Sequence, residues 1–129
     1  MSAAFPWAQL LAVALGSVIG GLARWQTQFW LNPRWAGFPL GTLLVNCVGG
    51  FLIGTALAWF ERTPNELWRL FLITGCLGGL TTFSSFSGES LLLLQRGEYA
   101  LALAHGAAHL LGALACAALG FWAMRSVTG

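Results

Sequence analysis

Four long apolar segments, joined by short polar loops, are the feature that most constrains how this chain can fold. A helix needs about 20 apolar residues to cross a bilayer, and segments of this kind lie at residues 7–25, 40–60, 67–95 and 99–124. Charged residues make up only 8% of the chain, against about 25% in a soluble domain. The sequence therefore predicts an all-α integral membrane protein in which residues 1–129 form one domain of four transmembrane helices in the lipid bilayer.

The third segment contains a polar stretch, Gly75–Glu89, in which glycines and hydroxyl residues replace the leucines expected in a membrane helix. Each glycine weakens a helix by about 1 kcal/mol relative to alanine. A continuous helix over residues 67–95 would be about 43 Å long, whereas the hydrocarbon core of a bilayer is about 30 Å thick. We therefore expect the third helix to be broken in mid-membrane, near residues 78–83.

The second segment carries Thr42, Asn46, Gly50 and Gly54 at four-residue spacing, so these residues share one helix face. An asparagine inside a membrane is costly unless its amide group is paired. Two interpretations of Asn46 stay open: it makes a hydrogen bond between helices, or it is a donor that faces a pore.

Small residues also form one face of the first and of the fourth segment, which favours close helix packing. In the first segment Gly16 and Gly20 lead to Arg24, which either reaches the lipid headgroups or has a buried or vestibule role. In the fourth segment the small residues are Ala104, Ala108, Gly112, Cys116 and Gly120.

His105 and His109 lie one helical turn apart on an adjoining face of the fourth segment. This spacing can bind a metal ion, but the sequence shows no third ligand nearby. We interpret the pair as polar residues that line a cavity or a vestibule. The remaining titratable groups are scattered and form no evident nucleophile–base pair, so the sequence does not predict an enzyme.

Arginine is distributed equally between the two sides of the predicted bundle, which leaves the positive-inside rule without a preference. A chain of this kind can insert in both orientations and form an antiparallel, dual-topology homodimer. Four short spans are also too few to enclose a lined path alone, which again favours assembly. The arginines are Arg62, Arg69 and Arg125 on the side of the termini, and Arg24, Arg34 and Arg96 on the other.

The polar stretch has the chemistry of a passage for a small anion. Phe83 and Phe86 share a helix face among hydroxyl residues, and an aromatic ring has a positive edge. Ring edges, hydroxyl hydrogens and an amide group replace part of an anion's hydration without the trap that a fixed positive charge would set. The net charge of +2 is too small to indicate a nucleic-acid partner.

Two motifs carry a resemblance to a known family. Gly41–Asn46 followed by Gly49–Gly50, together with the polar stretch Gly75–Glu89, resemble the Fluc (CrcB) family of fluoride channels over essentially the whole chain. The resemblance implies an antiparallel homodimer with two pores, which exports toxic fluoride passively down its gradient. It also implies a location in the bacterial inner membrane.

The resemblance further implies roles for individual residues. Asn46, Phe83 and Phe86 match the family's pore residues, and Ser84 and Glu89 match positions along the ion path. The backbone carbonyls of Gly78 and Thr81 match those that hold a structural Na⁺ at the dimer centre.

The fourth segment departs from the family's pattern, which has a track of hydroxyl residues spaced by four. The corresponding positions here are His105, His109, Ala113 and Ala117, so the histidines keep polarity and the alanines remove donors. Ordered water or backbone replaces those donors, or this chain conducts less well. The residue types do not determine the conduction rate or whether the histidines confer pH sensitivity.

Two other functions stay open. A small dual-topology transporter of organic cations has a similar size, but its chemistry needs a carboxylate in the first span, and none is present here. A non-conducting assembly subunit would use the polar stretch only to hold helices together.

Overall fold

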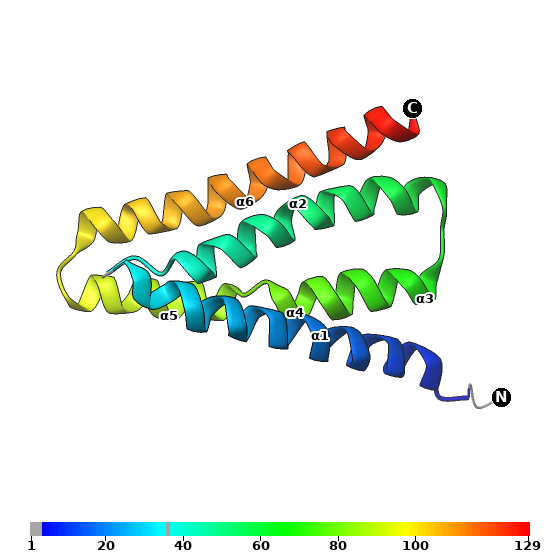
Figure 1. Cartoon of the computed structure of the whole chain (residues 1–129), viewed down its shortest axis with the longest axis horizontal. Helices are drawn as coiled ribbons and strands as arrows, with labels where there is room; N and C mark the ends of the chain where they lie inside the picture. Colours follow the sequence, from blue (N-terminus) through cyan, green and yellow to red (C-terminus); the bar gives the residue numbers. More distant parts are fainter. Residues whose placement is uncertain (1–3, 36) are drawn as a thin grey trace.

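The computed structural model describes residues 4–35 and 37–129, which form a bundle of long helices lying side by side (Figure 1). Within these residues, four helical segments are long and apolar enough to cross a membrane. This confirms the predicted all-α class and the four apolar segments. In chain order the elements are α1 (Trp7–Leu31), η1 (Asn32–Arg34), α2 (Leu40–Arg62), α3 (Glu66–Arg69), η2 (Leu70–Leu77), α4 (Gly78–Leu80), α5 (Phe83–Gln95) and α6 (Tyr99–Thr128).

The first, second and fourth segments extend beyond the expected spans. Helix α1 continues from the expected end near residue 25 to Leu31, and α6 continues to Thr128. Interfacial tryptophans and polar residues do not break a helix, and α1 and α2 each end two residues before a proline, Pro33 and Pro64. Pro33 begins the turn after α1, and Pro39 directly precedes α2.

The third segment is not one continuous helix. It begins with the short α3, which leads into a wide π-helical stretch, η2, and then the short α4. Thr81 and Thr82 then adopt extended backbone angles, with ψ of 155° and 117° respectively. The Thr82 hydroxyl accepts a hydrogen bond from the Ser85 backbone N–H at 3.0 Å and so caps α5. In Figure 1 the ribbon thins to a coil between α4 and α5.

Glycines allow the helices to approach closely in two pairs. In α1, a Cβ atom at Gly16 or Gly20 would lie 2.8 Å from the backbone nitrogen of Cys76 or Leu80. Between α2 and α6, a Cβ atom at Gly50 would lie 2.6 Å from the Ala113 carbonyl oxygen. The small faces of α1 and α2 are therefore helix-packing surfaces, as in other membrane bundles.

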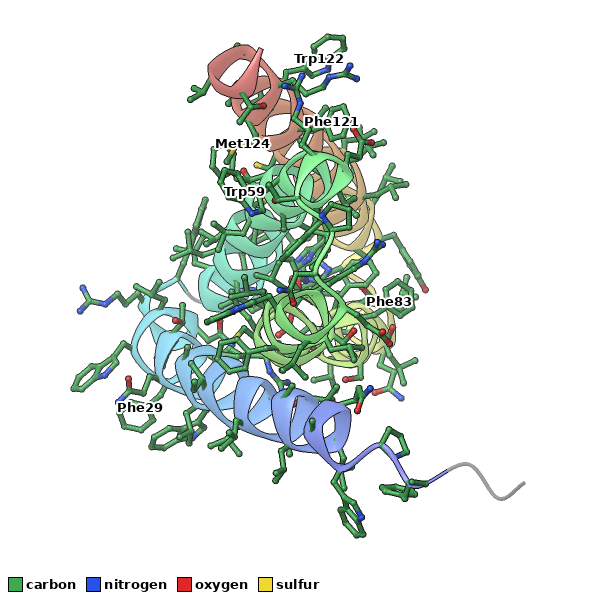
Figure 2. The ribbon with its side chains drawn as sticks, turned by 90° about the vertical axis from the view of Figure 1, so that its right-hand side faces the viewer. Phe29, Trp59, Phe83, Phe121, Trp122 and Met124 are labelled. Atoms are coloured by element: carbon green, nitrogen blue, oxygen red, sulfur yellow. The ribbon has the colours of Figure 1, made fainter. Side chains whose placement is uncertain are left out.

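The outer surface of the bundle is apolar. Leucines and aromatic residues stand outward from the helices, among them Phe29 and Trp122 (Figure 2). The start of α1, the C-terminus and the α2–α3 loop lie at one end of the bundle, and the α1–α2 and α5–α6 loops lie at the other (Figure 1). The equal number of arginines on the two sides of the predicted bundle assumes this placement of the loops.

Candidate functional site

The Asn46 side chain joins α2 to the interruption in the third segment. Its Oδ1 accepts a hydrogen bond from the Thr82 backbone N–H at 2.8 Å, and its Nδ2 donates to the Thr82 carbonyl oxygen at 3.0 Å. Nδ2 also lies 3.0 Å from Nδ1 of His109 on α6. Both amide hydrogens of Asn46 are thus used within the protein, as in the first of its two interpretations.

Aromatic rings surround this junction. The Phe83 and Phe86 rings lie 5.4 Å apart, and the Phe86 ring lies 4.7 Å from that of His109 and stacks on His105 at 5.1 Å. Phe38 meets His105 edge-on at 5.5 Å. Phe83 is 79% exposed and points away from the bundle, as Figure 2 shows. The two predicted pore phenylalanines therefore differ, because only Phe86 packs among these helices.

A cavity of about 1050 Å³ opens along one side of the bundle, between α2, the third segment and α6. Its walls are mostly apolar. Asn46, Phe83, Phe86 and His109 line it, together with Ala113 and Ala117. Three of the five residues predicted along the ion path thus share one cavity with His109, whereas Ser84 and Glu89 are not among its lining residues. The two alanines lie in its wall where hydroxyl residues were expected from the resemblance.

Glu89 lies at the centre of a second polar network. Its Oε1 is 2.5 Å from the Thr42 hydroxyl, and its Oε2 is 3.2 Å from Nε2 of His105. The Thr42 oxygen accepts from the side-chain amides of Gln28 at 3.1 Å and Asn32 at 3.4 Å. The amide nitrogens of Gln28 and Asn32 can only donate, so the Thr42 oxygen accepts from both of them. The Thr42 hydroxyl hydrogen is then free to be donated to Glu89.

The Arg24 side chain bonds to the third segment. Its Nε donates a hydrogen bond to the Gly79 carbonyl oxygen at 3.0 Å, from a partly buried position. The guanidinium therefore sits at the C-terminal end of α4, where a positive charge interacts favourably with the helix dipole. This contact favours the second interpretation of Arg24, a buried or vestibule role.

The interruption frees the backbone carbonyls that the resemblance assigned to Na⁺. In an uninterrupted helix the Gly78 oxygen would bond to the Thr82 N–H, and the Thr81 oxygen to the Ser85 N–H. Here Asn46 takes the Thr82 N–H and the Thr82 hydroxyl takes the Ser85 N–H. Carbonyl oxygens suit a hard cation. Those of Gly78 and Thr81, without their usual helical partners, therefore fit a Na⁺ ion.

Ser84, also expected along the path, lies directly after Phe83 at the start of α5. Its hydroxyl oxygen is 3.2 Å from that of Thr82, and the residue is exposed. Ser84 is therefore linked to the same interruption as Asn46, through the cap of α5.

The expectation that no third metal ligand lies near the histidines is wrong. Glu89, His105 and His109 bring candidate ligand atoms within 4.8 Å of one another. Sequence reasoning missed this cluster because Glu89 belongs to α5, and only the packing of α5 against α6 brings it to the histidines. A metal-binding histidine needs an acceptor for its second nitrogen, whereas Asn46 presents a donor to His109.

The sequence suggested that the titratable groups are scattered, but the structure brings several of them together. Ser90 Oγ lies 3.0 Å from Nδ1 of His105, whose Nε2 contacts Glu89, so the three side chains have the order of a hydrolase triad. His105 is fully buried at 0% exposure, and Ser90 and Glu89 are neighbours within one helix. The ring contacts are the reverse of those in that triad, because serine contacts Nδ1 and the carboxylate contacts Nε2 here, and the three residues form a hydrogen-bond network.

Several residues of these networks were not singled out from the sequence. The sequence placed Thr42 on the same helix face as Asn46, one turn away, but gave it no role. Its position on that polar face was the signal that could have indicated one. Nothing in the sequence pointed to Gln28, Asn32 or Ser90, because their partners lie on other helices.

Comparisons with known proteins agree with the family resemblance of the two motifs. The profile of the family described as "CrcB-like protein, Camphor Resistance (CrcB)" matches residues 11–121. A protein of Enterobacter sp. (strain 638), named "Fluoride-specific ion channel FluC", is 48% identical over 115 residues, covering 88% of this chain and 91% of that protein.

Two further relatives have the same name. The protein of Albidiferax ferrireducens is 51% identical over 107 residues, covering 81% of this chain and 82% of its own. The protein of Escherichia coli O139:H28 is 45% identical over 121 residues, covering 92% and 95%. With four helices able to cross a membrane and this similarity along almost its whole length, the chain belongs to the CrcB family, as a multi-pass membrane protein.

Proposed function

We propose that this protein is a fluoride-selective ion channel, not an enzyme, and that it lets F⁻ leave the cell passively down its electrochemical gradient. The observation that carries the proposal is the 45–51% identity to proteins named as fluoride-specific channels, over most of both chains. The export relieves fluoride toxicity, and the site is a bacterial inner membrane.

The residues around the cavity support passage of a small anion. The wall near Asn46 contains the Phe83 and Phe86 rings, tilted relative to each other, and the imidazole of His109, within otherwise apolar surroundings. Ring edges and N–H groups attract an anion moderately, and moderate attraction lets an ion both enter and leave. Ser84 and Glu89 continue the path beside these rings.

Arg24, His105 and His109 complete the path as vestibule or polar-track residues. Glu89 is held by Thr42 and His105, so its oxygens are directed into the protein and not toward the ion. A carboxylate turned inward in this way leaves the donors, and not the negative charge, to meet fluoride.

A second copy of the chain packs over the open side of the cavity in this proposal. Phe83 is 79% exposed beside it, and large leucines of α6 stand around it, including Leu103 at 76% and Leu110 at 70%. The equal distribution of arginines between the two ends supports two chains in opposite orientations. An antiparallel homodimer repeats the path twice and gives two pores.

A structural Na⁺ at the dimer centre is part of this proposal. The carbonyl oxygens of Gly78 and Thr81 would hold it, since the N–H groups that would otherwise bond to them are taken by Asn46 and Thr82. The ion would fix the extended backbone at Thr81 and Thr82 in mid-membrane and so keep the interruption open.

Growth on fluoride tests the function in a cell. A bacterial strain that lacks its own fluoride exporter should regain growth in millimolar fluoride when it expresses this chain, because passive efflux lowers the internal concentration. The matched control is the same strain expressing Phe83→Ala and Phe86→Ala together at equal protein level. Equal growth with the chain and with the empty vector would contradict the proposal.

A further inference from the structure

The orientation of the Asn46 amide is determined by its two bonds to the backbone of one residue, Thr82. Thr82 presents an N–H to Oδ1 at 2.8 Å and a carbonyl oxygen to Nδ2 at 3.0 Å. Turning the amide by 180° would set nitrogen against the N–H and oxygen against the carbonyl. Only one assignment of the amide oxygen and nitrogen satisfies both contacts.

This orientation in turn determines the state of His109. The Asn46 nitrogen is a donor only, and its second hydrogen faces Nδ1 of His109 at 3.0 Å. Nδ1 must therefore be the acceptor, and the single hydrogen of the neutral imidazole is on Nε2. An imidazolium, with a hydrogen on each nitrogen, would set its Nδ1–H against the same amide hydrogen.

The Nε2–H that results has no acceptor in the part of the chain that the structure describes. Among the described residues, Nε2 of His109 is a buried side-chain nitrogen without a hydrogen-bond partner, in a residue that is 5% exposed. Its neighbours are the rings of Phe86 and His105 at 4.7 and 4.5 Å, and the Glu89 carboxylate bonds to Thr42 and His105 instead. A buried donor of this kind is costly and points to a guest that supplies the acceptor.

We propose that the Thr82 backbone and Asn46 are positioning groups that lock His109 in its Nε2–H tautomer, and that this N–H donates to fluoride in the path. The inference rests on the proposed function and deepens it. Fluoride is an acceptor of about the size of a water molecule, so a small shift of Phe86 or His105 admits it. Asn46 then acts on the ion through His109, because both of its own hydrogens are already used.

The proposal also gives a reason why alanine is tolerated at two positions of the fourth helix. Ala113 and Ala117 follow His109 by one and two turns in the wall of the same cavity. They have no side-chain donor, whereas the locked imidazole provides one with a fixed direction.

Nitrogen-15 NMR of the histidine-labelled full chain tests the lock without any flux measurement. The chain has only two histidines, and the spectrum of His109→Gln identifies the signals of His105. In the wild type, His109 should show a protonated Nε2 and an unprotonated Nδ1. In Asn46→Leu, the Nδ1–H tautomer should appear, whereas Thr55→Ala on the same helix should leave the wild-type pattern.

A wild-type His109 protonated on Nδ1, or an Asn46→Leu spectrum identical to the wild type, would overturn the lock. The donor role is tested on the same sample by titration with NaF and with NaCl. The Nε2 signals should move with fluoride and not with chloride; signals that ignore fluoride would overturn the donor role.

Flux through two variants completes the test. His109→Leu removes the donor and should lower fluoride efflux about tenfold or more, whereas His109→Gln keeps an N–H and should retain more of the efflux. Wild-type efflux in His109→Leu would overturn the donor role. If the wild type itself passed no fluoride, the proposed function would fail. The NMR spectra would still show which nitrogen of His109 is protonated, so the two failures can be distinguished.

Discussion

At the scale of single residues, the two polar networks explain how this chain keeps asparagine, glutamate and two histidines between apolar helices. Unpaired polar groups are costly in such surroundings. Asn46 satisfies its amide on Thr82 and His109, and Glu89 satisfies its carboxylate on Thr42 and His105. The networks therefore connect α2, the interruption and α6 through side chains, and a change in one member leaves its partners unpaired.

Asn46→Asp is the substitution that most directly separates shape from hydrogen bonding. Aspartate has the same shape, but its carboxylate cannot donate to the Thr82 carbonyl or to His109, and it brings a negative charge into the path. We expect fluoride efflux to fall at least about tenfold. Initial efflux rates from liposomes measure it, with the amount of dimer checked by size-exclusion chromatography. An intact dimer with wild-type efflux would remove Asn46 from the path.

Thr42→Val tests the Glu89 network. Valine has the size of threonine but no hydroxyl, so Gln28, Asn32 and Glu89 all lose a partner. We expect the free energy of unfolding to fall by about 1–3 kcal/mol. The matched control is Thr27→Val, because the Thr27 hydroxyl bonds only to the backbone of its own helix, at Ala23. Equal stabilities of the two variants in a denaturant titration would show that the network is not stabilising.

At the scale of elements, glycines determine how closely the helices pack. Gly20 faces the third segment, whereas the next residue, Gly21, would have nothing within 4 Å of an added Cβ atom. Gly20→Ala places that atom 2.8 Å from the Leu80 backbone nitrogen, and α1 must move away from α4. We expect a loss of about 1–3 kcal/mol in stability, with no comparable loss in Gly21→Ala.

Thermal unfolding of the two glycine variants in the same detergent provides the comparison. The neighbouring position makes the control close, since both substitutions raise helix propensity equally. A Gly20→Ala protein as stable as Gly21→Ala would mean that α1 does not pack on the third segment in this register.

The elements that follow from local sequence were predictable, and those that depend on several helices meeting were not. The four apolar segments and the small-residue faces at Gly16, Gly20 and Gly50 can be recognised from period and composition alone. The ends of α1 and α6 could not, because interfacial residues continue a helix without a sequence signal. The cluster of Glu89 with His105 was missed for another reason, since the sequence shows helix faces but not which faces meet.

At the scale of the whole molecule, the proposed antiparallel dimer depends on a balance of arginines. Arg62→Gln with Arg69→Gln leaves an excess on one side of the bundle, and Arg34→Gln with Arg96→Gln leaves it on the other. Each variant should then insert in one orientation only. We expect neither to restore growth in fluoride alone, and the two to restore it when they are expressed together.

Reporter fusions at the C-terminus measure the orientation of each variant. Restored growth with one variant alone, in a population shown to have a single orientation, would contradict an antiparallel assembly. It would leave a parallel dimer or a single chain as the conducting unit.

The most direct test of the central claim is anion efflux from liposomes that contain the purified protein, with fluoride and chloride compared under equal gradients. The account predicts rapid passive fluoride efflux and negligible chloride efflux, because donors and ring edges that replace the water around F⁻ favour a small, strongly hydrogen-bonding anion. Chloride efflux as fast as that of fluoride, or no fluoride efflux from an intact dimer, would contradict it.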